Sequence, residues 1–337
     1  MDVDQFIDHK KTQAIFSEEI AAHLKNFFRD YVKAGKENGW DEAALGRIFL
    51  SYVEQVAKEH VRPYPFLTYH QKILAPFNYY ELGINFMRPL VDEKSSFYLG
   101  TDTLDSIQSQ LNAKENAVFF GNHQIEPDPQ LMALLLRENY PKLAEEMIFV
   151  AGHRVTTDPL ATPISKGTNM LCIFSKKYLD DLPEKKMERI QHNQKTMKQM
   201  GQLLAEGGKC IYVAPSGGRD RPGASGEVEV APFDAASIEM FYLIAKHAKT
   251  PTHFYPLSLS SYSLLPPPDR IFQDLGERRE PKKAPIALWF GEEIEMEKEA
   301  TEDLLSRQEK RQLRADLIYE EVKKGYEILK KRIKELQ

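Results

Sequence analysis

The chain has 337 residues, of which 42% are hydrophobic and 28% are charged. This is the composition of a globular protein with a sizeable buried core, and it excludes disorder as the main state. The 45 basic and 50 acidic side chains give a net charge of -5. Because no overall positive field exists to hold a nucleic acid, any phosphate must be recognised by a local cluster of cations.

Cys172 and Cys210 both lie in apolar stretches, which favours two buried thiols in a reducing compartment over a disulfide. No stretch approaches the roughly 18 consecutive apolar residues of a membrane helix. We therefore expect a soluble protein with no transmembrane segment and at most transient membrane contact. The acidic N-terminus lacks signal and transit patterns. A bacterial cytoplasm is compatible with this sequence, as is a plastid stroma if a transit peptide was removed.

Two helices are predicted near the N-terminus, over residues 16–33 and 41–60, because apolar residues recur there at helical spacing. Ser17 is expected to cap the first helix and Gly35 to end it. No strand signal appears before residue 75. We predict that residues 1–75 form a small helical bundle with short connections.

Beyond residue 75, short apolar runs alternate with helical patterns, as is typical of an α/β domain. We predict that residues 76–337 form this larger catalytic domain, with a mixed sheet flanked by helices. The expected strands are 117–120, 147–151, 170–174, 210–214, 252–257 and 286–290. The expected helices are 129–139, 183–206, 235–247 and 302–337.

Three polar segments directly follow expected strands: residues 121–129, 175–178 and 215–222. Ligand sites in open α/β sheets lie just outside the carboxyl ends of the strands. Our working hypothesis is therefore that these three segments converge on one site.

The first polar segment, GNHQIEPDP, places His123 at the end of a strand. A neutral imidazole can remove the proton of an attacking hydroxyl near pH 7, and a carboxylate on its other nitrogen fixes the tautomer. His123 and Asp128 can supply these roles without a serine or cysteine nucleophile. The spacing fits a structural role equally well, because Asp128 before Pro129 also suits the N-cap of a helix.

The pattern NHxxxxD from Asn122 to Asp128 resembles the signature of the glycerolipid acyltransferases. The form NHQIEPDP is similar to that of the soluble, plastid-type glycerol-3-phosphate acyltransferases. Three further segments, 152–177, 214–222 and 254–258, resemble the other blocks of this family in the same order. Four ordered blocks are more specific than a single HxxxxD, which would recur by chance.

Arg219 and Arg221 lie two residues apart, after Gly217 and Gly218. In an extended segment their side chains would project to one side, and two guanidinium forks suit a phosphate dianion. A solvated turn is the plain alternative, and the charged triplet alone favours it. The position after a strand and the family resemblance reverse that preference.

The resemblance implies a role for each matching residue: His123 is the general base, Asp128 its partner, and Lys177, Arg219 and Arg221 bind the glycerol phosphate. It also implies the reaction, in which a fatty acyl group passes from acyl carrier protein or coenzyme A to the sn-1 hydroxyl of glycerol 3-phosphate. This is the first step of phospholipid synthesis. Neither a metal nor a bound cofactor is expected.

Two positions depart from the family pattern. Tyr178 stands where the family has a histidine, and His153 stands where the plastid enzymes have an acid. Because a neutral phenol replaces a potential cation at Tyr178, phosphate affinity or acceptor selectivity is expected to differ. His153 is left out of the predicted catalytic residues.

Three other functions compete with acyl transfer. A metal-dependent phosphoesterase would use four side chains as metal ligands, namely His123, Glu126, Asp128 and His153, although no HExxH pattern is present. A serine hydrolase would use Ser216, but its surroundings, PSGG, lack the first glycine of GxSxG. A binding module without catalysis would hold an acidic partner at the basic patches of residues 185–186 or 278–283.

Overall fold

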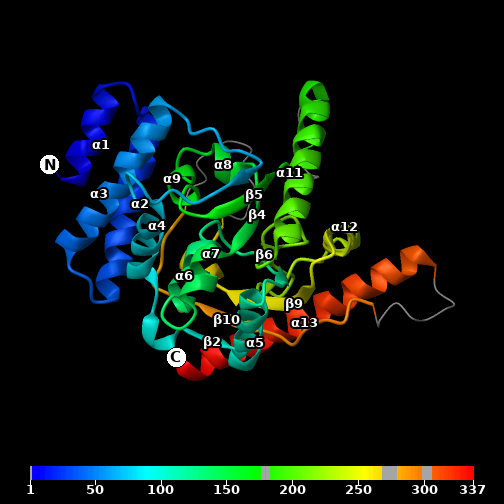
Figure 1. Ribbon diagram of the computed structural model, residues 1–337. Coiled ribbons are helices and arrows are strands. Elements are labelled where there is room, and N and C mark those ends of the chain that lie inside the picture. Colours follow the sequence, from blue (N-terminus) through cyan, green and yellow to red (C-terminus); the bar gives the residue numbers. More distant parts are fainter. Residues whose placement is uncertain (1, 176–178, 180–182, 268–278, 298–305) are drawn as a thin grey trace.

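The computed structural model describes residues 2–175, 179, 183–267, 279–297 and 306–337. In this part of the chain, a group of N-terminal helices is followed by an α/β region built on an eight-stranded mixed sheet (Figure 1). Helices cover both faces of that sheet. The fold class predicted from the sequence is therefore confirmed.

Three helices form the N-terminal region: α1 (Val3–Thr12), α2 (Glu18–Glu37) and α3 (Glu42–Val61). Ser17 caps α2 as predicted, since its side chain accepts a hydrogen bond from the backbone N–H of Ile20. The rings of Tyr31 and Phe49 lie 5.5 Å apart where α2 meets α3. Aromatic contacts of this kind pack the bundle together.

Gly35 does not end α2, contrary to the sequence prediction. The helix continues to Glu37, and Gly35 is buried where α2 packs against α3. A Cβ atom at Gly35 would lie 2.5 Å from Cδ2 of Leu45, well inside the usual ~3.5–4 Å separation of carbon atoms. This glycine therefore permits a close approach of two helices and is not a stop signal.

The expectation that no strand occurs before residue 75 is also wrong. Strand β1 (Tyr69–His70) pairs antiparallel with β5 (Asn169–Ile173) at one edge of the sheet. Helix α4 (Tyr79–Met87) packs on α3, and the core of the bundle also includes Ile125 from the larger region. The division of the chain at residue 75 stays a prediction.

The sheet has the strand order β1-β5-β4-β6-β3-β9-β10-β2. Its five central strands, β5 to β9 in this order, are parallel, while β1, β10 and β2 run the opposite way. All six strands expected from the sequence are present. The remaining bounds are β2 (Phe97–Leu99), β3 (Asn116–Gly121), β4 (Ile148–Gly152), β6 (Cys210–Val213), β9 (Thr252–Ser260) and β10 (Ala287–Phe290).

Adjacent residues of β3 point to opposite faces of the sheet and pack against different layers of helices. Phe119 packs in the core beside α5, α6 and α7, whereas Phe120 packs in the core beside α11, α12 and α13. Burial on both faces explains why the central strands read as continuous apolar runs. These helices are α5 (Thr101–Asn112), α6 (Asp128–Leu136), α7 (Pro141–Glu146), α11 (Lys186–Glu206), α12 (Ala235–Ala248) and α13 (Arg307–Leu336).

The smaller elements lie in the connections. Helices α8 (Arg154–Thr157) and α9 (Thr162–Ser165) follow β4, and the hairpin of β7 (Arg221–Pro222) and β8 (Val228–Glu229) follows β6. The four helices expected in the larger region correspond to α6, α11, α12 and α13, although the expected start of the last lies outside the described residues. Both cysteines are buried free thiols. No helix in the described part has the length and hydropathy needed to cross a membrane.

We expect Gly35→Ala to lower the free energy of unfolding by about 1–3 kcal/mol, because Leu45 is fully buried and cannot move away from the new methyl group. Gly46→Ala is the matched control: it lies in α3, where a Cβ would meet no atom within 4 Å. We expect it to raise the free energy by about 0.5–1 kcal/mol. Urea unfolding measures both, and an equal gain in stability for the two variants would contradict this packing account.

Candidate active site

His123 lies just past the carboxyl end of β3, in the middle of the sheet between β6 and β9. The strand ends at Gly121, where a Cβ would lie 2.7 Å from the Tyr212 ring and 2.8 Å from the carbonyl oxygen of Leu257. Glycine is thus required for Tyr212 to lie across the strand end. The hydroxyl of Tyr212 donates a hydrogen bond to the carbonyl oxygen of Asn122, which fixes the point where the loop leaves the strand.

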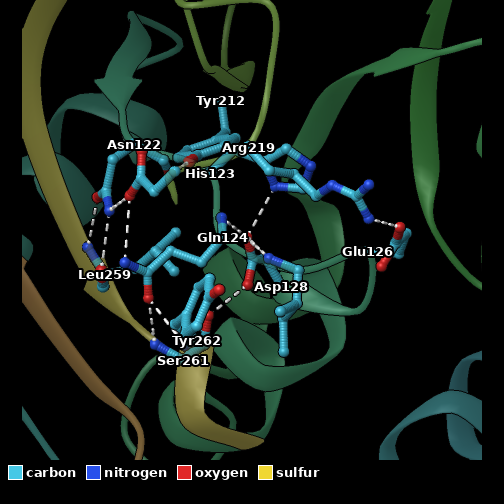
Figure 2. Close-up of polar contacts among 12 residues, drawn as sticks. Asn122, His123, Gln124, Glu126, Asp128, Tyr212, Arg219, Leu259, Ser261 and Tyr262 are labelled. Carbon is cyan, nitrogen blue, oxygen red and sulfur yellow. Dashed lines mark hydrogen bonds and ion pairs between the residues drawn. The ribbon is translucent and has the colours of Figure 1, made fainter. Parts of the chain in front are cut away.

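The structure brings His123 and Asp128 together, as the sequence analysis predicted. The Nδ1 atom of His123 lies 2.8 Å from Oδ2 of Asp128 (Figure 2). The Asp128 side chain is 2% exposed, whereas that of His123 is 31% exposed. Within the described part of the chain, no residue is hydrogen-bonded to Nε2. This geometry leaves Nε2 available to an incoming hydroxyl.

Asp128 is the first residue of α6, yet its carboxylate does not cap that helix. Its Oδ2 atom also accepts the backbone N–H groups of Gln124, at 2.8 Å, and Ile125, at 3.2 Å. Its Oδ1 atom accepts the hydroxyl of Ser261 at 2.6 Å. The carboxylate therefore binds back to the loop that carries His123, and the N-cap alternative does not describe it.

The two neighbours of His123 point inward and attach the loop to β9 and to the residue that follows it. The side-chain amide of Asn122 pairs with the backbone of Leu259, donating to its oxygen at 3.0 Å and accepting from its nitrogen at 2.8 Å. The Oε1 atom of Gln124 accepts the backbone N–H of Ser261 at 2.7 Å. Both amide side chains are fully buried. In this alternating arrangement the imidazole between them points outward (Figure 2).

Asp220 is a further buried carboxyl at this site, with no exposed surface. Its Oδ2 atom accepts Asn122 Nδ2 at 2.7 Å and Gln124 Nε2 at 3.1 Å, and its Oδ1 atom accepts the backbone N–H of Ala231 at 2.9 Å. Its own backbone N–H donates to the carbonyl oxygen of His123 at 2.7 Å. Burial raises the pKa of Asp220 to about 6, although these side-chain hydrogen bonds oppose the shift.

Arg219 extends its guanidinium to Glu126 (Figure 2), and Arg279 contacts the same carboxylate oxygen. Burial by itself would raise the pKa of Glu126, but the two guanidinium groups outweigh it and hold the pKa below its ordinary value. The loop that carries His123 thus presents a carboxylate to two arginines. An anionic ligand that approached these arginines would compete with Glu126 for them.

The other predicted phosphate ligands are placed less directly. Arg221 opens β7, which pairs with β8, while Lys177 and its neighbour Tyr178 lie outside the described residues. His153 precedes α8 and stacks on Phe174 with ring centroids 5.2 Å apart. Of the five predicted site residues, the structure thus joins His123 with Asp128 and attaches Arg219 to the same loop.

Sequence reasoning missed the supporting residues Asp220, Gln124, Ser261 and Tyr212, and it treated Arg279 only as part of a surface patch. One signal was present for Asp220. Neighbours in an extended segment point to opposite sides, so arginines that face a ligand would turn Asp220 toward the interior, where a polar group needs partners. The other residues come from distant parts of the chain, and no local pattern marks them.

The alternative chemistries find no support in this geometry. Across the described ranges, no group of three or more His, Cys, Asp or Glu residues is arranged to hold a metal ion. Glu126, a ligand in the phosphoesterase hypothesis, is bound by two arginines. The hydroxyl of Ser216 donates to the carbonyl oxygen of Gly218 at 2.9 Å, and no histidine in the described part is hydrogen-bonded to it.

The raised pKa of Asp220 predicts a specific pH dependence of stability. A carboxyl whose pKa rises on folding from 3.8 to about 6 favours the folded state while it is protonated. That contribution is lost as the pH rises between these values. Relative to Asp220→Asn, we expect the free energy of unfolding of the wild type to fall by about 2 kcal/mol from pH 4 to pH 7. Urea unfolding across this range tests it, and parallel profiles would contradict it.

Comparison with known proteins assigns the chain to a family. The family model described as acyltransferase matches residues 104–260, a range that contains β3, the His123 loop, Arg219, Arg221 and β9. A chloroplastic glycerol-3-phosphate acyltransferase of Cucurbita moschata is 35% identical over 315 residues, which cover 92% of this chain and 68% of that protein.

Two further relatives agree with this assignment. A chloroplastic glycerol-3-phosphate acyltransferase of Arabidopsis thaliana is 34% identical over 94% of this chain and 69% of its own length. One of Carthamus tinctorius is 32% identical over 96% of this chain and 73% of its own length. Because the similarity extends over nearly the whole chain and over two thirds or more of these relatives, this protein belongs to the family of glycerol-3-phosphate acyltransferases.

Proposed function

We propose that this protein transfers a fatty acyl group from a thioester to the sn-1 hydroxyl of glycerol 3-phosphate, with His123 as the general base. The names of its relatives support both the reaction and the acceptor. The observation that carries the proposal is the His123–Asp128 pair at the carboxyl edge of the sheet. Its buried carboxylate holds Nδ1, so that Nε2 faces the space where a hydroxyl can approach.

In the proposed mechanism, Nε2 of His123 accepts the hydroxyl proton while the hydroxyl oxygen attacks the thioester carbonyl carbon. The tetrahedral intermediate then collapses with cleavage of the carbon–sulfur bond. The imidazolium returns its proton to the departing thiolate, so the products are 1-acylglycerol 3-phosphate and a thiol. Asp128 stabilises the imidazolium between these steps, since a carboxylate with fixed donors needs no reorganisation.

Arg219, Arg221 and Lys177 are the proposed ligands of the acceptor phosphate. The position of Arg219 supports this role, because its guanidinium reaches the loop that carries His123. Arg279 adds a second guanidinium at the same carboxylate. Paired forks of this kind bind a phosphate dianion through charge-assisted hydrogen bonds.

The proposed donor is the acyl thioester of acyl carrier protein or of coenzyme A, and an assay with each donor decides between them. We propose no metal and no bound cofactor. The reaction would form the first intermediate of phospholipid synthesis. A plastid stroma is the location that the chloroplastic relatives support, and the bacterial cytoplasm remains the alternative prediction.

Replacing the base should abolish turnover with little effect on binding. We expect His123→Ala to lower kcat about 10²–10⁴-fold at a similar KM for glycerol 3-phosphate. The matched control is His253→Ala, at the amino end of β9, where the imidazole contacts Glu115 and Glu293. That variant should transfer acyl groups at the wild-type rate. Thioester consumption with and without glycerol 3-phosphate measures both.

Near-normal transfer by folded His123→Ala protein would contradict the proposed mechanism. Hydrolysis of a phosphomonoester that a chelator abolishes would instead support the metal-dependent phosphoesterase.

Replacing the arginine should mainly weaken acceptor binding. We expect Arg219→Ala to raise the KM for glycerol 3-phosphate about 10–100-fold, because one or two charge-assisted hydrogen bonds to the phosphate are lost. Arg219→Lys, which keeps the charge without the fork, should raise it less. Arg137→Ala is the control, because that arginine pairs with Glu81 on another part of the molecule. An unchanged acceptor KM in Arg219→Ala would rule out phosphate binding by this residue.

A further inference from the structure

Asp220 contacts both of the loops from which the proposed site is built. It belongs to the segment that carries Arg219 and Arg221, and its backbone N–H donates to the carbonyl oxygen of His123 at 2.7 Å. Its side chain accepts hydrogen bonds from Asn122 and Gln124, the two neighbours of that histidine. One residue of the segment that carries the two arginines therefore binds three consecutive residues of the His123 loop.

The direction of the Asp220 side chain suits a connection between these loops. It is fully buried, whereas Arg219 next to it extends toward Glu126 at the surface of the site. Its second oxygen accepts the backbone N–H of Ala231, just past the β7–β8 hairpin. Asp220 thus also closes the base of that hairpin.

The hairpin base is in turn supported by α13. The hydroxyl of Tyr319 donates to the carbonyl oxygen of Val230 at 3.0 Å, and Val230 itself is buried. Movement of the arginine segment is therefore limited on two sides. The His123 loop lies on one side and α13 on the other.

At neutral pH, above the raised pKa of Asp220, the hydrogen-bond donors of the cluster face a carboxylate. Asn122, Gln124 and Ala231 all present N–H donors to Asp220, and a carboxylate is an acceptor at both oxygens. An asparagine of the same shape would place its NH₂ group against at least one of these donors. Such a substitution keeps the volume of the side chain but disturbs the hydrogen bonds between the loops.

We propose that Asp220 is a positioning residue that fixes the position of the arginine segment relative to the His123 loop. The inference rests on the proposed function, in which the arginines bind the acceptor phosphate and His123 removes the proton from its hydroxyl. A phosphate and a hydroxyl on one small acceptor span a set distance, so the two loops must match that distance. Misplacement by about 1 Å is enough to reduce transfer about 100-fold.

The test compares the kinetics of Asp220→Asn with those of the wild type. A residue that aligns both loops should affect both constants: we expect kcat to fall and the KM for glycerol 3-phosphate to rise, each about tenfold, with the KM for the acyl donor unchanged. In an Arg219→Ala background the same substitution should have a smaller effect on KM, because the contact that it aligns is already lost.

Asn116→Ala is the matched control. Asn116 is also fully buried and makes three hydrogen bonds, to Leu204, Thr252 and Lys209, but at the amino end of β3. It should lower the melting temperature while the kinetic constants per folded molecule stay unchanged. If Asp220→Asn behaves in the same way, with lower stability and normal kinetics, the inference is overturned and Asp220 is only structural.

Two reference measurements separate this inference from the proposed function. If the wild type transfers no acyl group to glycerol 3-phosphate, or folded His123→Ala retains transfer, the proposed function fails. If both references behave as proposed and Asp220→Asn is kinetically normal, only the positioning role fails.

Discussion

The hydrogen bond between Asp128 and His123 depends on a carboxylate that is almost fully buried. Burying a charge is costly unless its lone pairs are filled, and here the imidazole, two backbone N–H groups and the Ser261 hydroxyl fill them. These donors keep Asp128 an acceptor toward Nδ1 and so fix which nitrogen faces outward. The loop needs such side-chain bonds because its residues form neither a strand nor a helix between β3 and α6.

Strands β3 and β9 and helix α13 support this loop. Strand β3 is buried on both faces, so the point from which the loop starts is set by two hydrophobic layers. Strand β9 continues beside the loop and supplies the partner of Asn122, and Ser261, the residue after β9, supplies a partner for Gln124. Helix α13 holds β9 through a bond from Ser258 Oγ to the carbonyl oxygen of Val322. His123 thus projects from a rigid base, as preorganised catalysis by the proposed mechanism requires.

Much of this arrangement could be predicted from the sequence, for physical reasons. Central parallel strands must be apolar throughout, and ligand sites follow their carboxyl ends, which together placed His123 correctly. Other features depend on contacts between distant segments. The local pattern around Gly35 fits a helix stop, and only the contact with Leu45 shows that this glycine serves helix packing. Arg279 likewise contacts Glu126, which lies 153 residues away in the sequence. Local patterns carry no information about such tertiary contacts.

The proposed mechanism requires Asp128 to hold His123 in the tautomer whose Nε2 can accept a proton. Nitrogen-15 NMR of the labelled histidine, in wild type and in Asp128→Asn, tests this directly. We expect the neutral form of the wild-type imidazole to carry its proton on Nδ1 and none on Nε2, and this preference to weaken in Asp128→Asn. A neutral wild-type imidazole with its proton on Nε2 would contradict the proposed mechanism.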